Sequence, residues 1–223
     1  MASLYTYCIP YDDGAAPNPF WGICTLAICK PAIRRTADKG DWVVGTGSRN
    51  SPMGDISNQV VYAMEVTEVL TTAEYDTWSR KSCPNKIPDW KNSDIRRRLG
   101  DAIYDYSVSP PRQRQGVHNS GNIETDLSGK NVLLSKKFYY FGNVPQPLPQ
   151  DLQEIVKQGQ GHRVRLNQPY VGTFLKWIGS LGLEPNRLYG EPEFKLFEDE
   201  VNMAGATIRA ACAGKDSVCQ HDL

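Results

Sequence analysis

The sequence lacks the short motifs that mark the common catalytic and nucleotide-binding folds. It contains no GxSxG, HExxH, GxxxxGK[ST] or GxGxxG pattern, which removes the clearest signatures of α/β-hydrolases, zinc proteases and P-loop or Rossmann proteins. It has only 3 histidines, and its 6 cysteines form no CxxC pair. We therefore expect no bound metal and no cofactor.

Long apolar runs are also missing. No segment approaches the roughly 18 residues that span a bilayer, and the N-terminus shows no basic-then-apolar signal pattern. We expect a cytoplasmic protein with reduced thiols and no membrane partner.

Charge of one sign is not in excess, since 25 Lys and Arg balance 25 Asp and Glu. This excludes a basic surface that covers the whole molecule. The distribution is uneven, because residues 80–165 carry 15 Lys and Arg against 8 Asp and Glu. Only this region has the electrostatics for a phosphate-bearing partner, although an unevenly charged solvated face would look the same.

The pattern of apolar residues predicts a mixture of strands and helices. Aromatic and β-branched runs predict strands at residues 4–10, 42–44, 60–70 and 132–141. Helical spacing predicts helices at 71–80, 149–158, 170–181 and 201–213. Residues 83–131 have little periodicity and are expected to form a long basic loop insertion, mobile from 107 to 129.

Several residues could hold a flat ring such as a nucleobase. Trp42 and Tyr140 fall on predicted strands and could stack on it. Trp21 in APNPFWG could stack on the ring as well. Asn18, Thr46 and Ser48 would read its edge, with Phe20 and Gly47 beside it, and Arg49 would neutralise a phosphate. For each of these rings, a place in the core is the alternative, and for the glycines a plain turn.

Basic and titratable residues suggest two further roles. The candidates for phosphate binding are Arg34, Arg35, Arg97, His162 and Arg163. Lys30, Thr36 and Glu65 could form a small general-base site, with a structural salt bridge as the alternative.

The order of several segments resembles a known family. These segments are APNPFWG, CTLAICKPAIRR, GDWVVGTGS, VYAMEVTEVL and EY, followed by GDAIY, FYYFG and GH. Together they resemble the nucleotide modification associated domain family of bacterial and phage proteins across nearly the whole chain. The resemblance implies an association with DNA-base modification and phage–host conflict, without a defined reaction.

A broader resemblance concerns the pair GDWVVGTGS and VVYAMEVTEVL, which is similar to the central strands of PUA-like barrels such as the EVE, YTH and ASCH domains. Those barrels hold a flipped base in an aromatic pocket beside a basic groove. The ASCH branch includes amidohydrolases with a Lys, Thr and Glu set, to which Lys30, Thr36 and Glu65 correspond loosely.

These observations predict an α+β protein with a PUA-like mixed β-barrel core. The chain is expected to form a single domain over 1–223, with barrel residues 1–82 and 130–183, the insertion 83–131 and a helical tail 184–223. The predicted function is a reader of a modified base in DNA or RNA, or of a free nucleotide, rather than an enzyme. The alternatives are a hydrolase acting on a modified nucleoside or base, and a protein-binding accessory factor.

Overall fold

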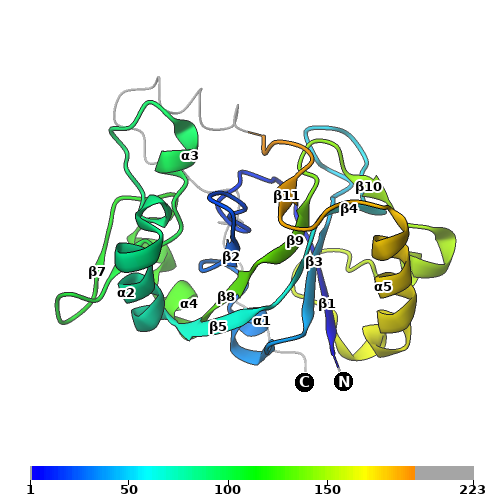
Figure 1. Cartoon of the computed structure of the whole chain (residues 1–223), viewed down its shortest axis with the longest axis horizontal. Coiled ribbons are helices and arrows are strands. Elements are labelled where there is room, and N and C mark those ends of the chain that lie inside the picture. The colour runs from blue at the N-terminus through cyan, green and yellow to red at the C-terminus, as the bar shows by residue number, and fades with distance from the viewer. Residues whose placement is uncertain (1, 194–223) are drawn as a thin grey trace.

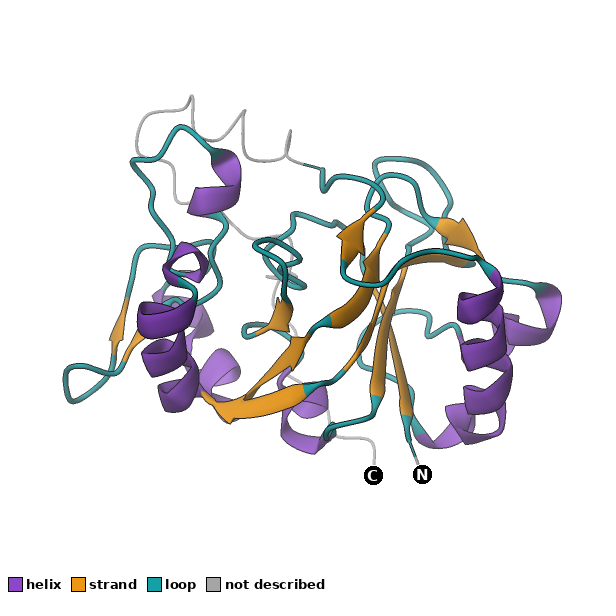
Figure 2. Cartoon of the chain, in the orientation of Figure 1, coloured by secondary structure: helices purple, strands orange, loops and turns teal. Residues whose placement is uncertain are grey.

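A computed structural model describes residues 2–193, and the helix expected at 201–213 lies outside them. The described strands form a six-stranded, a three-stranded and a two-stranded sheet. Figures 1 and 2 show α5 on one side of the largest sheet and the smaller sheets with most of the other helices on its opposite side. No helix in residues 2–193 has the length and apolar composition needed to cross a membrane.

The largest sheet, called the main sheet below, is mixed. Its order is β1 (Leu4–Cys8), β3 (Trp42–Thr46), β4 (Gln59–Glu65), β9 (Lys137–Tyr140) and β11 (Arg187–Leu188), and β10 (Gln146–Pro147) also pairs with β4. The pairs β1–β3 and β9–β11 are parallel, and the other pairs are antiparallel.

The second sheet is antiparallel and has the order β2 (Cys24–Leu26), β8 (Asn131–Ser135) and β5 (Glu68–Thr71). The strands expected at 60–70 and 132–141 each divide between the two sheets. Both divide at the same place, because the Thr67 N–H donates to Leu134 O at 2.8 Å and the Lys136 N–H donates to Thr67 Oγ1 at 3.1 Å. The described strands therefore bend between two open sheets and do not close into the predicted barrel.

The helices match part of the sequence prediction. α2 (Thr72–Ser82) confirms the helix expected at 71–80 and begins with a capping box between Thr71 and Glu74. α5 (Val171–Ser180) confirms the helix expected at 170–181, whereas the segment at 149–158 forms a 3₁₀ helix, Gln150–Ile155. The other helices are α1 (Pro31–Thr36), α3 (Ile95–Arg98), α4 (Ile123–Ser128) and the 3₁₀ helices Pro84–Lys86, Ser120–Asn122 and Arg165–Tyr170.

The prediction of a loop at residues 83–131 is wrong. This segment contains α3, α4 and the hairpin of β6 (Tyr104–Asp105) and β7 (Arg112–Gln113). It also contributes buried polar residues, among them Lys86 and Asp101. These buried positions hold hydrogen-bonded polar side chains. Hydrophobic periodicity therefore could not show that the segment is part of the core.

Candidate functional site

Two aromatic residues predicted to hold one ring lie on opposite faces of the main sheet. Trp42 packs on the face covered by α5, where its ring meets Phe174 edge-on at 5.6 Å. Tyr140 belongs to the core of the other face, and its hydroxyl donates to Asp12 Oδ2 at 2.5 Å. Strand alternation separates the two rings, so no single base can contact both.

The segment after Trp42 is packed against its neighbours. A Cβ at Gly47 would lie 2.4 Å from a side-chain carbon of Ile56. The buried Thr46 hydroxyl donates to the Tyr7 carbonyl at 3.3 Å, and Ser48 Oγ accepts the Asn50 N–H at 3.1 Å. Close packing thus accounts for Gly47 without a ligand.

Arg49 lies just beyond this packed turn. Its side chain is 72% exposed and lies 3.8 Å from Asp55.

Arg34 and Arg35, predicted to bind phosphate, bond to the protein itself. Arg34 is fully buried and donates to the main-chain carbonyls of Cys29, Asp126 and Asn131 at 2.7, 2.5 and 2.8 Å. Burial lowers the pKa of its guanidinium. Arg35 is exposed and donates to the Ser128 carbonyl at 3.0 Å.

Two more residues predicted to bind phosphate, His162 and Arg163, lie beside β1. The His162 ring is 5.8 Å from the Tyr5 ring, and burial, together with nearby lysines, lowers its pKa. Arg163 exchanges main-chain hydrogen bonds with Thr6 at 2.9 and 2.8 Å.

The three candidates for a general-base site each contact a different neighbour. They are Lys30, Thr36 and Glu65. The Lys30 ammonium lies 4.7 Å from the centre of the Tyr7 ring. The Thr36 hydroxyl donates to the Ala32 carbonyl, and Glu65 accepts from Lys137 Nζ at 2.7 Å. These contacts favour the salt-bridge interpretation of Glu65.

Three predicted residues do come together, at the tip of the APNPFWG loop. The Phe20 and Trp21 ring centres are 6.3 Å apart, and the Arg97 guanidinium carbon lies 6.0 Å from the Trp21 ring centre. The guanidinium carbon of the neighbouring Arg96 lies 5.8 Å from the same ring centre. These four residues are called the Trp21 site below.

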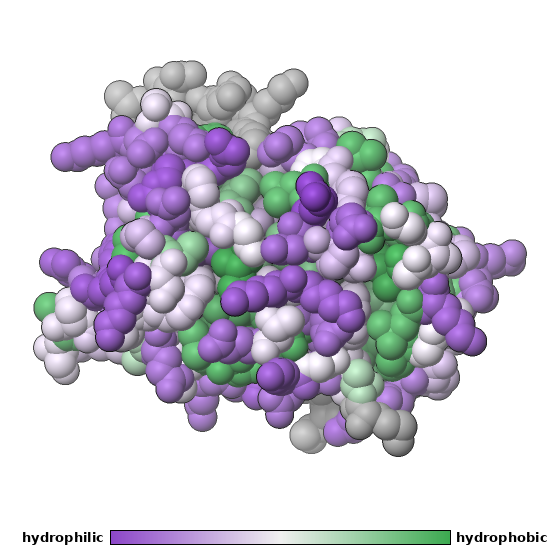
Figure 3. Space-filling view, viewed as in Figure 1, coloured by the Kyte–Doolittle hydropathy of each residue, from purple (hydrophilic) through white to green (hydrophobic). Residues whose placement is uncertain are grey.

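The charges at the Trp21 site are only partly neutralised. Arg96 donates to both carboxylate oxygens of Asp94, from Nε to Oδ1 at 3.0 Å and from Nη2 to Oδ2 at 2.9 Å. None of the ion pairs within residues 2–193 includes Arg97, whose contacts with the carbonyls of Pro84 and Ile87 are long, 3.4 and 3.5 Å. Figure 3 shows hydrophilic residues over the region of α3. Arg97 is therefore the most available cation of the site.

A buried lysine holds the loop that carries Trp21. Asn18 donates to the Leu99 carbonyl at 2.8 Å, and Lys86 Nζ donates to the carbonyl and side-chain oxygens of Asn18 at 2.9 and 2.7 Å. Lys86 Nζ also lies 2.9 Å from Thr25 Oγ1. Lys86 is fully buried, and burial lowers the pKa of its ammonium. Asn18 is thus a residue that anchors the loop, and Trp21 with φ 68° is presented beyond it.

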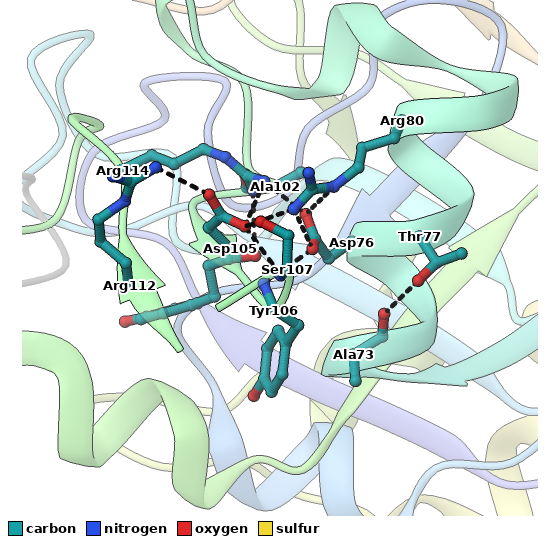
Figure 4. A network of polar contacts seen from close by, with 11 residues as sticks. Ala73, Asp76, Thr77, Arg80, Ala102, Asp105, Tyr106, Ser107, Arg112 and Arg114 are labelled. Carbon is teal, nitrogen blue, oxygen red and sulfur yellow. Dashed lines mark hydrogen bonds and ion pairs between the residues drawn. The ribbon is translucent and has the colours of Figure 1, made fainter. Parts of the chain in front are cut away.

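Other arginines of the basic segment are neutralised away from the Trp21 site. Arg80 bonds to Asp76 and Asp105, Arg112 to Asp105 at 3.0 Å, and Arg114 to Asp76 at 2.6 Å. Figure 4 shows that this network ties α2 to the β6–β7 hairpin. Three arginines of residues 80–165 therefore stabilise the fold through these ion pairs.

The fold and this site define a mixed α/β protein with an aromatic and basic surface site. The chain matches the family model described as nucleotide modification associated domain 2 over residues 1–200, and it belongs to that family. Searches of curated proteins and of solved structures gave no match. The family supports a role connected with modified nucleotides, and the open sheets give no support to the PUA-like resemblance.

Sequence reasoning missed Lys86 and did not place Arg96. The run Arg96–Arg98 was visible, but nothing in the sequence placed it beside a loop more than seventy positions earlier. The polar context of Lys86 gave no sign that this residue is buried.

Proposed function

We propose that the chain is a reader that binds a modified base of a nucleic acid strand, or a nucleotide, at the Trp21 site. The observation that carries the proposal is the Trp21 ring with the guanidinium carbons of Arg96 and Arg97 at 5.8 and 6.0 Å. An indole offers a stacking surface for any base, and guanidinium groups bind phosphate through paired N–H donors. Membership of the family supports a role of the chain connected with nucleotide modification. The proposal includes a role in phage–host conflict.

Loop anchoring supports the proposal as well. Because Lys86 and Leu99 fix Asn18, the loop is ordered before a ligand arrives, and binding loses little conformational entropy. The aromatic ring of Trp21 remains partly exposed, and its buried indole N–H has no hydrogen-bond partner among the described residues.

The test measures the affinity for labelled single-stranded DNA, with and without a modified base, by fluorescence anisotropy. Trp21→Ala should weaken binding about 10- to 100-fold, as expected for the loss of one base–aromatic stack. Trp78→Ala is the matched control, since Trp78 stacks on Tyr75 at 5.6 Å on α2. Equal affinities of wild type and Trp21→Ala would contradict the proposal.

Arg49→Ala separates this site from the turn after Trp42. Arg97→Ala should weaken binding. Arg49 is more exposed to solvent than Arg97, and Arg49→Ala should leave binding unchanged. The reverse result would move the binding site to residues 46–49. A preference for the modified base over the plain one would distinguish a reader from a general strand-binding protein.

A further inference from the structure

A cysteine, a histidine and an aspartate form a linear arrangement away from the Trp21 site. Cys29 Sγ lies 3.3 Å from His118 Nε2, and His118 Nδ1 lies 2.5 Å from Asp126 Oδ2. All three side chains are buried, and Cys29 comes from a segment 89 positions before His118. From this geometry we propose that Cys29, His118 and Asp126 form a thiol catalytic centre for acyl transfer.

The order of the three groups is the one that nucleophilic catalysis requires. A carboxylate at Nδ1 holds the neutral imidazole in the tautomer that carries its proton on Nδ1. The lone pair of Nε2 then faces the thiol and can accept its proton. Each ring nitrogen of His118 thus has the partner expected of a general base that activates a cysteine.

The surrounding hydrogen bonds position the centre. Asp126 Oδ1 accepts the Cys29 N–H at 3.0 Å, and Asp126 Oδ2 also accepts the Tyr104 hydroxyl proton at 2.9 Å. The buried Arg34 guanidinium holds the carbonyls of both Cys29 and Asp126. On the other side, Gln113 Nε2 donates to the His118 carbonyl at 3.2 Å. Arg34, predicted from the sequence to bind phosphate, is by these contacts a positioning residue.

The backbone at the cysteine is also unusual. Cys29 and Lys30 have φ values of 56° and 42°, in the left-handed region that non-glycine residues rarely adopt. They form the turn between β2 and α1, so the thiol sits at a strand–turn–helix junction. Strained backbone of this kind is concentrated at functional sites, where surrounding contacts maintain it.

The reaction follows from the groups present. Nε2 accepts the thiol proton while sulfur forms a bond to the carbonyl carbon of an amide or ester. The C–N or C–O bond then breaks, and the imidazolium gives its proton to the departing amine or alcohol. Water attacks the resulting thioester, which releases a carboxylic acid and restores the thiol. The chemistry of this centre does not depend on the Trp21 site. The inference rests on the proposed function only in taking the substrate's acyl group to be attached to a nucleotide.

The first test measures alkylation of each cysteine by iodoacetamide against pH, using peptide mass spectrometry. At pH 6, Cys29 should react at least about tenfold faster than Cys8 and Cys83, because His118 Nε2, 3.3 Å from the sulfur, accepts the thiol proton as the sulfur attacks. Cys8 and Cys83 are more exposed, and burial raises the pKa of Cys83. His118→Asn should remove this advantage, and Asp126→Asn should reduce it.

The comparison within the wild-type protein remains decisive if a variant fails to fold. A Cys29 rate at pH 6 no higher than that of Cys83 would overturn the proposal, as would a pH profile unaffected by His118→Asn in a folded variant.

The second test uses p-nitrophenyl acetate as a plain acyl donor. Wild-type protein should release nitrophenolate in a burst and carry one acetyl group on Cys29, and Cys29→Ala should lose both signals. Acetylation of Cys8 at the same rate as Cys29 would contradict the proposal. Asp151→Asn, at an exposed position outside both sites, should react at the wild-type rate. Because this assay contains no nucleotide and the anisotropy assay contains no acyl donor, failure of this centre and failure of the Trp21 site give different results.

Discussion

Trp42 and Tyr140 lie on opposite faces of the main sheet, each inside a different hydrophobic core. Trp42 is 3% exposed and Tyr140 is fully buried. The strands that carry them are both joined to β4, and alternation along these strands sends the two rings to opposite sides. This relationship moves the expected base contact from the centre of the sheet to the loop that carries Trp21.

Trp42→Ala should therefore destabilise the protein without identifying a ligand site. Loss of the buried ring beside Phe174 should lower the free energy of unfolding by about 3–5 kcal/mol. Trp21→Ala removes a partly exposed ring and should cost about 1–2 kcal/mol. Urea denaturation of both variants measures the difference. If Trp42→Ala kept wild-type stability and lost nucleic-acid binding, the pocket predicted from the sequence would be right.

Sequence patterns predicted the parts of the fold that depend on local signals. The Thr71 cap and apolar spacing located α2, and aromatic and β-branched residues located β1 and β3. The bends at Thr67 and Lys136 were not predictable, because each strand runs on without a turn signal and the hydrogen bonds between the bends form only in the fold.

The candidate sites were predictable to different degrees. Phe20, Trp21 and Arg97 were each identified from residue type, but their meeting depends on contacts made through Lys86 and Leu99. His118 was not among the predicted site residues, because residues 107–129 were expected to be mobile, whereas its ring is buried against Asp126. Long-range pairing of polar residues leaves no periodic signal in the sequence.

Lys86→Met should destabilise the protein and disturb the Trp21 site together. The substitution leaves the buried oxygens of Asn18 and Thr25 without their donor, which should cost about 3–5 kcal/mol. Lys91→Met, at an exposed position of the same segment, is the control and should change stability by less than about 0.5 kcal/mol. Chemical denaturation and anisotropy measure the two effects. A Lys86→Met protein with unchanged stability would show that Lys86 does not anchor the loop.

Asp105 should make the protein sensitive to acid. Hydrogen bonds from the Ser107 hydroxyl and N–H, with Arg80 and Arg112, hold the pKa of this carboxyl well below its ordinary value. Its contribution to stability is thus present above the unfolded-state pKa of about 3.9 and is lost as pH falls toward the folded-state pKa. Asp105→Asn should be less stable than wild type at neutral pH, and its stability should fall less steeply below about pH 4.

The measurement for Asp105 is urea denaturation between pH 2.5 and 7, with Asp151→Asn at an exposed position as the control. The Asp151→Asn curve should run parallel to wild type. Parallel curves for Asp105→Asn and wild type would show that the network in Figure 4 contributes nothing to acid stability.

Binding of single-stranded DNA should weaken as salt rises, since each phosphate contact releases a counterion. The slope of log affinity against log salt is about −0.7 for each phosphate neutralised on a single strand. Arg97→Ala should make this slope less negative by about that amount, because Arg97 is the site's cation with no ion pair among the described residues. Arg112→Ala is the control, since Arg112 already pairs with Asp105 and should leave the slope unchanged. A wild-type slope near zero would instead identify the ligand as a nucleoside or a free base, because neither presents a phosphate to the arginines of α3.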